Sequence, residues 1–264
     1  MYNNLQLARK YVHYYINAYN GKGHGMHSPF VFNFIQHVLN GGNEKDLEDI
    51  EALRKSLLRN RNMLQITDLG AGSRSAKVSR RSVKQIAASA LKPPRLATIL
   101  YRLSKFYKPD VVIELGTSLG ITTSCFSRAL PQSTIISIEG SGPVAAVANE
   151  NFQKLGCKNI QVLEGNFDDV LKPLLDRIPL VDLAYIDGNH RYEPTIRYFH
   201  WFLEKSDEHT IMVFDDIHWS PEMEKAWEEI KAHPSVRYTI DIFFLGFVFF
   251  REEFKVKQHF LIRS

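Results

Sequence analysis

The sequence contains very little cysteine and no long hydrophobic run. Its 264 residues include two cysteines, Cys125 and Cys157, which are too few for a disulfide framework or a four-thiolate zinc site. The longest nearly apolar stretch, residues 242–250, is far shorter than the ~20 residues that a membrane-spanning helix needs. The first residues also lack a continuous apolar stretch of signal-peptide length. We therefore expect a cytoplasmic protein without a transmembrane segment.

Charge of one sign does not dominate the chain either. The net charge is +4 and 44% of the residues are apolar, so the chain should bury a core and disorder is excluded as its main state. The charge is nevertheless uneven: residues 1–110 contain 18 Lys and Arg against 7 Asp and Glu, and residues 111–264 contain 15 against 22. Two interpretations remain open, a basic layer packed on an acidic one, or a basic lid over a site that holds acids.

The spacing of apolar residues changes near residue 110. Before it, helical spacing predicts a helical N-terminal cap, residues 1–108, which should supply a substrate pocket. After it, short β-branched runs alternate with helical stretches, so residues 109–264 should form an α/β domain with a doubly wound, mostly parallel sheet. Only Leu245 and Gly246 separate the last two strand-like runs, so the last strand should run antiparallel in a hairpin. Seven strands are expected, at 111–115, 134–138, 160–163, 183–186, 211–214, 237–244 and 247–251.

Two glycine-containing turns compete for the role of nucleotide-binding turn, residues 67–73 and residues 111–120. Each places glycines after a short apolar run, where the missing Cβ lets the backbone approach a ligand closely. Only the second turn is followed by a helix and then by a strand that ends in an acid, Glu139. An acid at the tip of the second strand is placed to accept the ribose hydroxyls of an adenosine. We therefore assign the cofactor turn to residues 111–120.

The pattern of that turn excludes two common classes of nucleotide ligand. Residues 114–120 read Glu-Leu-Gly-Thr-Ser-Leu-Gly and lack the middle glycine of a dinucleotide turn. The chain also contains no Gly-x-x-x-x-Gly-Lys-Ser/Thr sequence for a nucleoside triphosphate. An acid-led turn of this kind suits a ligand without phosphates and with a cationic amino-acid end. S-adenosylmethionine fits that description.

Five motifs together resemble the class I S-adenosylmethionine-dependent methyltransferases, nearest to the O-methyltransferases that act on catechol, caffeoyl-CoA and macrolide sugars. They follow in the order and near the spacing of that family, and they extend over more than half of the chain. The resemblance implies a Rossmann-like fold and S-adenosylmethionine as cofactor. The motifs are residues 114–120, 137–140, 164–167, 185–192 and 213–219.

The resemblance also implies which residues bind the cofactor. In the turn that runs from Glu114 to Gly120, Gly116 and Ser118 would cradle the methionine end, and Glu139 would bind the ribose. The residues that would border the adenine are Gly165, Asn166 and Phe167. A position in the hydrophobic core explains the aromatic ring of Phe167 equally well.

Three acids should meet at the carboxyl edge of the predicted sheet. Asp187 follows one strand, and Asp215 and Asp216 follow the next, and parallel strands end at the same edge. Three oxygen ligands suit Mg²⁺ or another hard divalent cation. The metal-dependent relatives carry Asp, Asp and Asn at these places, so Asp216 departs from the family pattern. The alternative is that Asp215 or Asp216 caps a helix and Asp187 binds the amine of the cofactor.

His190 is the candidate general base. It lies three residues after Asp187, where the catechol-type relatives carry a lysine and the macrolide-sugar relatives a histidine. A histidine with a pKa near neutrality can take the proton of a hydroxyl at physiological pH. The alternative is a histidine that is only hydrogen-bonded to Asp216.

These features predict O-methylation of a small-molecule hydroxyl, with a divalent cation and a histidine base. One alternative is an RNA methyltransferase that uses the basic cap for phosphate contacts. It is disfavoured because no Asn-Pro-Pro-Tyr-type motif follows Asp187, and we expect no stable nucleic-acid partner. A second alternative is a non-catalytic binding protein on the same fold. The sequence determines neither the identity of the methyl acceptor nor the oligomeric state. A homo-oligomer is one option.

Two further segments have open roles. Between Arg74 and Arg95 the chain carries basic residues and no acid, which predicts either a contact for an anionic substrate or a solvated helix face. His24 and His27 lie on a glycine-containing loop, residues 21–29, and either line a substrate pocket or are solvated.

Overall fold

The computed structural model describes residues 1–42, 44–68 and 77–264. These residues group into two compact units. Unit 1 consists of Met1–Asn40 and Leu175–Ser264, and unit 2 consists of Gly41–Leu174. Both units contain residues from either side of position 108, so this grouping divides the chain differently from the predicted cap, residues 1–108, and cofactor domain, residues 109–264. That functional division remains a prediction.

The described strands form one large and one small sheet. The strands of the large sheet are β3 (Val111–Leu115), β4 (Thr134–Glu139), β5 (Ile160–Glu164), β6 (Leu183–Ile186), β7 (Ile211–Asp215), β8 (Tyr238–Asp241), β9 (Leu245–Phe249) and β10 (Gln258–Leu261). Their order is β10-β8-β9-β7-β6-β3-β4-β5. The mostly parallel α/β fold is therefore confirmed, and the sheet has an eighth strand, β10, beyond the seven that were predicted.

Unit 2 is built on three parallel strands. β4 pairs in parallel with β3 on one side and with β5 on the other. A core of buried side chains, which includes Ile50, Ile86, Ala97, Ile121 and Val144, joins five of its helices. The helical elements of unit 2 are η2 (Lys45–Leu47), α3 (Glu48–Leu57), α4 (Val83–Ala90), α5 (Pro94–Tyr107), α6 (Ile121–Ala129), α7 (Gly142–Lys154) and α8 (Phe167–Leu175).

Unit 2 also contains a hairpin that the expectation of an all-helical cap missed. β1 (Met63–Asp68) pairs antiparallel with β2 (Lys77–Ser82). The centres of the two strands are about 14 residues apart in the sequence. Neither run is apolar enough to be predicted as a strand from the sequence alone. The competing glycine turn, residues 67–73, falls almost entirely outside the described residues.

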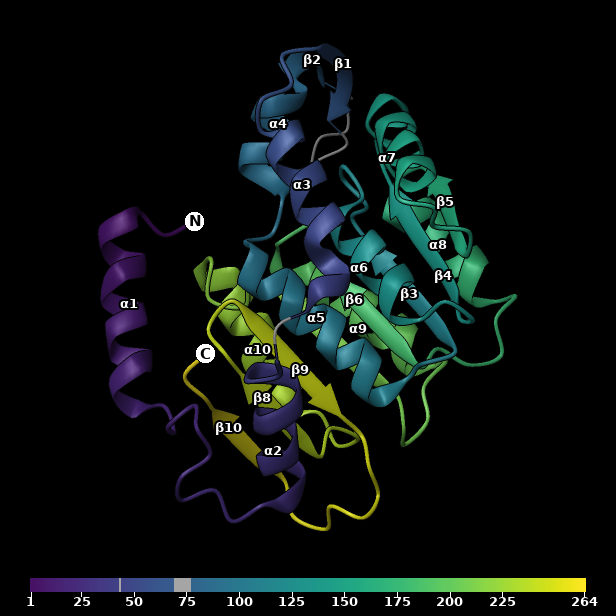
Figure 1. The fold of residues 1–264 in the computed structure, drawn as a ribbon. Coiled ribbons are helices and arrows are strands. Elements are labelled where there is room, and N and C mark those ends of the chain that lie inside the picture. The colour runs from purple at the N-terminus through teal and green to yellow at the C-terminus, as the bar shows by residue number, and fades with distance from the viewer. Residues whose placement is uncertain (43, 69–76) are drawn as a thin grey trace. The chain divides into compact units, whose positions relative to one another are not determined.

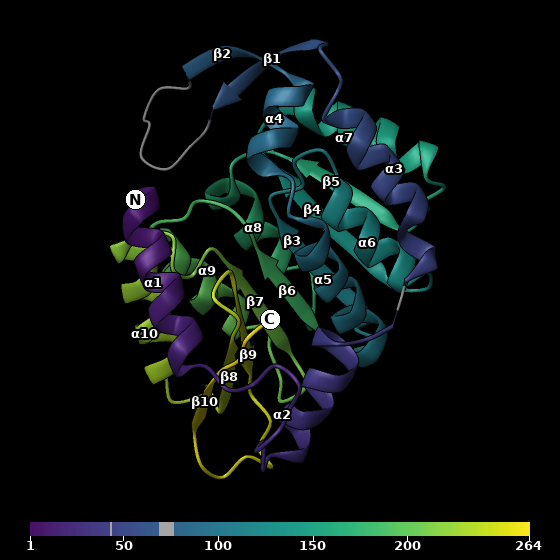
Figure 2. The ribbon, with the colours of Figure 1, turned by 60° about the vertical axis from the view of Figure 1, so that its left-hand side comes forward.

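Unit 1 contains the antiparallel part of the large sheet (Figures 1 and 2). β9 runs antiparallel to both β7 and β8, so the predicted hairpin is confirmed. Its turn lies at residues 242–244, where Phe243 has a φ of 73°. Gly246 is instead a strand residue of β9, where a Cβ would lie 2.7 Å from the ring of Trp227. The helical elements of unit 1 are α1 (Asn4–Asn17), α2 (Pro29–Phe34), η1 (Ile35–Leu39), α9 (Tyr192–Leu203) and α10 (Pro221–Ala232).

β10 pairs in parallel with β8, with Gln258 opposite Tyr238. Its residues Gln258 and His259 are exposed, so the strand lacks the apolar run by which the other strands were found. Among the described residues, none of the helices combines the length and the apolar character that a bilayer crossing requires.

The two cysteines should differ sharply in reactivity. Cys125 is fully buried, and this burial raises the pKa of its thiol to about 12, whereas Cys157 is only partly buried. A thiol with so high a pKa carries almost no reactive thiolate at about pH 8. Iodoacetamide should therefore modify one thiol of the native chain and both thiols in denaturant, as measured by intact mass. Equal labelling of both cysteines in the native protein would contradict this packing.

Candidate functional site

The turn after β3 adopts backbone conformations that favour glycine. Gly116 and Gly120 have φ values of 103° and 82°, and Ser118 has a φ of 48°. Gly120 directly precedes α6, and a Cβ on it would lie 2.5 Å from the ring of Phe152. The glycines therefore allow a tight turn that is packed against α7. The close approach of a ligand to this turn, residues 111–120, remains a prediction.

The carboxylate of Glu139 holds this turn against the end of β4. Its Oε2 accepts a hydrogen bond from the backbone N–H of Ser118 at 2.8 Å, and its Oε1 accepts one from that of Ser141 at 3.0 Å. Burial raises the pKa of the Glu139 carboxyl, and the backbone hydrogen bonds offset only part of that rise. Glu139 therefore lies at the strand tip predicted from the sequence, as an acid whose charged form is partly desolvated.

Two buried hydroxyls accompany this carboxylate. The Oγ atoms of Ser118 and Ser141 have no hydrogen-bond partner within residues 1–42, 44–68 and 77–264. Buried hydroxyls are rarely left without partners, so their presence in the turn indicates a polar ligand. The sequence had singled out Ser118 but not Ser141, although Ser141 directly follows the Ser-Ile-Glu-Gly motif at 137–140.

Glu114 lies beneath the turn and is fully buried. Its Oε2 accepts hydrogen bonds from the hydroxyls of Thr123 and Ser137. The contacts show Glu114 joining β3, β4 and α6, and direct contact with a cofactor remains a prediction.

The segment predicted to border the adenine follows β5. Gly165 has a φ of 144°, and its N–H donates to the carbonyl of Glu139 at 3.0 Å. The side chain of Asn166 accepts a hydrogen bond from the N–H of Asp168 at 3.1 Å, at the start of α8. Phe167, the first residue of α8, is half-buried. The structure therefore brings Gly165 next to Glu139, and the adenine contact itself remains a prediction.

A second group of polar residues lies in unit 1, after the ends of β6 and β7. One potential ligand atom each from Asp187, His190 and Asp215 lies within 4.8 Å of the others. The Nε2 atom of His190 is 3.6 Å from Oδ1 of Asp187, and the Tyr185 hydroxyl donates to Oδ2 of the same acid at 3.1 Å. Asp215 is 1% exposed. Two carboxylates and an imidazole at this spacing form a group that suits a divalent cation.

Asp216, the third predicted ligand, is not a member of this group. It has a φ of 53°, its N–H donates to the carbonyl of Phe244 at 2.8 Å, and its own carbonyl accepts from Trp219 at 2.9 Å. The backbone of Asp216 therefore builds the turn after β7. Its role as a ligand remains a prediction that the grouping of the described residues does not support.

The same turn carries a polar network that the sequence did not reveal. The ring of His218 lies between Glu224 and Asp241, with N–O distances of 3.2 and 2.8 Å. Burial lowers the pKa of His218, but the two carboxylates outweigh that effect and the net shift is upward. Lys10 of α1 donates to both carboxylate oxygens of Glu224 at 2.9 Å, and the Tyr2 hydroxyl donates at 2.7 Å. Charge thus joins α1 to α10 and to the turn that follows Asp215.

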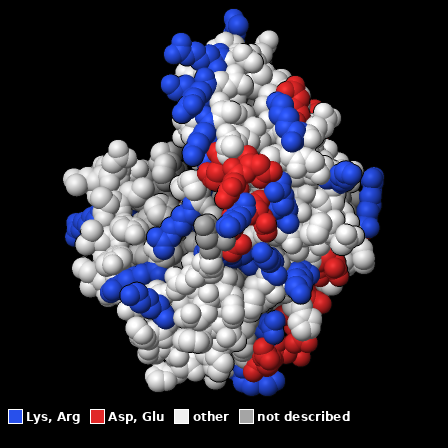
Figure 3. Space-filling model, viewed as in Figure 1, with Lys and Arg blue, Asp and Glu red and all other residues white. Residues whose placement is uncertain are grey.

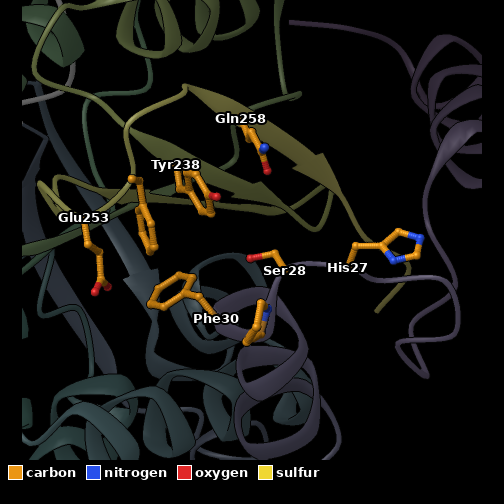
Figure 4. A pocket seen from close by; sticks show the side chains of 8 residues that line it. His27, Ser28, Phe30, Tyr238, Glu253 and Gln258 are labelled. Carbon is orange, nitrogen blue, oxygen red and sulfur yellow. The ribbon is translucent and has the colours of Figure 1, made fainter.

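A cavity of about 520 Å³ lies elsewhere in unit 1, among the side chains shown in Figure 4. Its wall includes His27 of the glycine-containing loop, together with Tyr238 and Gln258, the first residues of β8 and β10. A substrate-binding role for His27 remains a prediction. β8 runs parallel to β7, because both are antiparallel to β9. The cavity therefore lies at the opposite edge of the unit 1 strands from Asp215, which ends β7.

The basic segment between 74 and 95 is only partly described. Arg80 and Lys84 are exposed, whereas Arg81 donates to the Ser89 hydroxyl at 2.8 Å. Arg74 lies outside the described residues. Both interpretations of this segment, an anion contact and a solvated face, remain open.

Comparison with known proteins agrees with this geometry. Residues 113–217 match a family model described as a methyltransferase domain. Over 127 residues the chain is 30% identical to a catechol O-methyltransferase of Niastella koreensis, and the match covers 47% of this chain and 57% of that enzyme. The chain therefore spans little more than half the length of that relative.

Two solved structures show the same fold. TomG, an O-methyltransferase from Streptomyces achromogenes solved in complex with S-adenosylmethionine, aligns with a TM-score of 0.54 and 20% identity over 61% of this chain and 82% of its own. A Podospora anserina methyltransferase bound to S-adenosylhomocysteine aligns with a TM-score of 0.59 and 12% identity over 96% and 98% of the two chains. Residues 113–217 are thus similar to a methyltransferase domain, and the chain is similar in sequence to an O-methyltransferase, in agreement with the resemblance of its motifs.

Proposed function

We propose that this chain transfers the methyl group of S-adenosylmethionine to a hydroxyl oxygen of a small molecule. The observation that carries the proposal is the group formed by Asp187, His190 and Asp215 after the ends of two parallel strands. In a chain with a methyltransferase domain, such a group suits the removal of a proton from an acceptor hydroxyl. The match to a catechol O-methyltransferase supports the same class of acceptor.

The residues around Glu139 fit the cofactor. The two buried serine hydroxyls without partners in the described part of the chain offer hydrogen bonds to its polar ends, with Ser118 assigned to the methionine end. The carboxylate of Glu139 would accept hydrogen bonds from the ribose hydroxyls. Gly116 would let the backbone approach the ligand, and Gly165, Asn166 and Phe167 would border the adenine. Glu114 would keep the turn in shape from below.

His190 would take the proton of the acceptor. When bound, S-adenosylmethionine would supply a methyl group on a positively charged sulfur for transfer to the acceptor oxygen. The proton of the hydroxyl passes to a ring nitrogen of His190. The Asp187 carboxylate lies 3.6 Å from Nε2 of His190, beside the ring that would receive the proton. The Tyr185 hydroxyl holds the other oxygen of Asp187 and so limits its rotation.

The same residues fit a divalent cation. Asp187 and Asp215 would supply carboxylate oxygens, the ligands that Mg²⁺ prefers. Bound there, the ion would lower the pKa of an acceptor hydroxyl and lessen the basicity required of His190. Asp187 also remains the candidate for binding the amine of the cofactor. Asp187→Asn separates the two roles, because only the amine role predicts weaker S-adenosylhomocysteine binding in the absence of a cation.

Replacement of Glu139 should weaken cofactor binding. We expect Glu139→Ala to reduce the affinity for S-adenosylhomocysteine by about 1.5–3 kcal/mol, because hydrogen bonds to a charged group are lost. Burial raises the pKa of this carboxyl, so on acidification it should be protonated at a higher pH than an ordinary glutamate. The affinity for the cofactor should fall in the same pH range. Calorimetric titration at several pH values measures both effects, and Glu139→Gln should lack the acid-side fall. Unchanged affinity in Glu139→Ala would place the cofactor elsewhere.

The loss of His190 should slow methyl transfer without affecting the cofactor. A methyl acceptor is first identified by screening phenols, catechols and sugars for release of S-adenosylhomocysteine. With this acceptor as the substrate, we expect His190→Ala to reduce kcat by about 10²–10⁴ while cofactor affinity stays nearly constant, because a general base acts mostly in the transition state. Asp215→Asn should lower both Mg²⁺ affinity and turnover.

Two results would contradict this assignment in different ways. Full turnover in an excess of chelator would show that no cation takes part, and His190 would then act alone. Full turnover in His190→Ala would show that His190 is not the base. A chain that binds S-adenosylhomocysteine but methylates no member of the panel would favour the alternative of a non-catalytic binding protein.

A further inference from the structure

Helix α1 turns an apolar face away from unit 1. Leu5, Val12 and Ile16 are 80%, 56% and 69% exposed, and Tyr15 beside them is 47% exposed. Tyr11 forms the border of this face, because it is 37% exposed and its ring centre lies 5.0 Å from that of Phe243. At 3.6 residues per turn these five side chains lie on one side of the helix. Single exposed apolar residues are ordinary on protein surfaces, but a continuous face of this size indicates an interaction site.

The opposite side of the same helix is firmly attached. Tyr14 is buried and its hydroxyl donates to the carbonyl of Ile262, while Lys10 and Tyr2 bind Glu224 of α10. The helix begins with a capping box in which Asn3 and Gln6 exchange hydrogen bonds. The exposed apolar face therefore belongs to a well-formed helix that already has its packing partner on the other side.

The surroundings of this face are basic. The first 43 residues contain no Asp or Glu, and Arg9 lies at the border of the apolar face. The guanidinium of Arg263 lies 4.5 Å from the centre of the Tyr15 ring, and its Nε donates to the carbonyl of Tyr15 at 2.7 Å. In Figure 3 the surface at the left of the view, where α1 lies in Figure 1, shows white and blue but no red. An apolar helix face bordered by cations and tyrosines matches the chemistry of a bilayer interface.

We propose that the outer face of α1 binds the surface of an anionic lipid bilayer, with the helix axis in the plane of the membrane. A second copy of the chain fits less well. In an antiparallel pair of α1 helices related by a two-fold axis, the flank of the helix that carries Arg9 and His13 would face the same flank of the second copy. Arg9 and His13 would then lie opposite the same residues of that copy. Anionic lipid headgroups instead complement that flank.

Sedimentation with vesicles tests the proposal. The whole chain should bind vesicles that contain phosphatidylglycerol, bind phosphatidylcholine vesicles more weakly, and lose affinity as salt is raised. The triple variant Leu5→Ser, Val12→Ser, Ile16→Ser should lose at least about tenfold in partition coefficient, because three apolar side chains leave the interface. Arg9→Glu should reduce binding to the anionic vesicles alone. Leu58→Ser with Phe106→Ser is the matched control, because these residues are also exposed, at 38% and 40%, and lie elsewhere in the chain.

Two results would overturn the proposal. One is equal vesicle binding by the triple variant and the wild type, with folding of both confirmed by circular dichroism and by S-adenosylhomocysteine binding. The other is a dimer of the wild type that becomes a monomer in the triple variant, seen by light scattering, without vesicle binding by either form. The second result would assign the face to a copy of the chain.

Discussion

Unit 2 depends on a carboxylate at the end of a strand that binds backbone N–H groups from two separate turns. Glu139 accepts from Ser118 in the turn after β3 and from Ser141 before α7. A buried carboxylate carries a desolvation cost, which is visible in its raised pKa, and charge-assisted hydrogen bonds offset part of that cost. Without this acid, the turn after β3, in which Gly116, Ser118 and Gly120 have positive φ angles, and the turn before α7 would lose the group that holds them. A cofactor whose hydroxyls add hydrogen bonds to the same carboxylate would complete its solvation.

Residues that act locally were predictable from the sequence. Gly116 and Gly120 are required by positive φ angles at their own positions, and Glu139 ends a strand whose apolar run is readable in isolation. For the same reason the boundaries of the seven predicted strands agree with the observed boundaries to within a few residues. Conformation at such positions is decided by the residue itself and its near neighbours.

Residues whose positions depend on distant partners were not predictable. β10 is a strand only because it pairs with β8, and β1 only because it pairs with β2. The positive φ of Asp216, 53°, and its backbone hydrogen bond to Phe244 in the turn after β7 were likewise not predicted, while its role as a ligand remains a prediction. His218 shows the same limit, because one of its two partners, Asp241, lies 23 residues away in the sequence.

The attachment of α1 explains how an apolar helix face can remain outside. Its small apolar contact cluster is centred on Tyr14, Ala18 and Phe243, and the rest of its attachment is polar, through Lys10 and Tyr2 to Glu224. The same Glu224 binds His218 in the turn that follows Asp215. Helix α1 is therefore connected, through the Glu224 carboxylate and the His218 imidazole, to the turn that follows Asp215, an acid of the proposed active site. Whatever occupies the outer face of α1 acts on a helix that is coupled to this turn by charge, not by a large shared core.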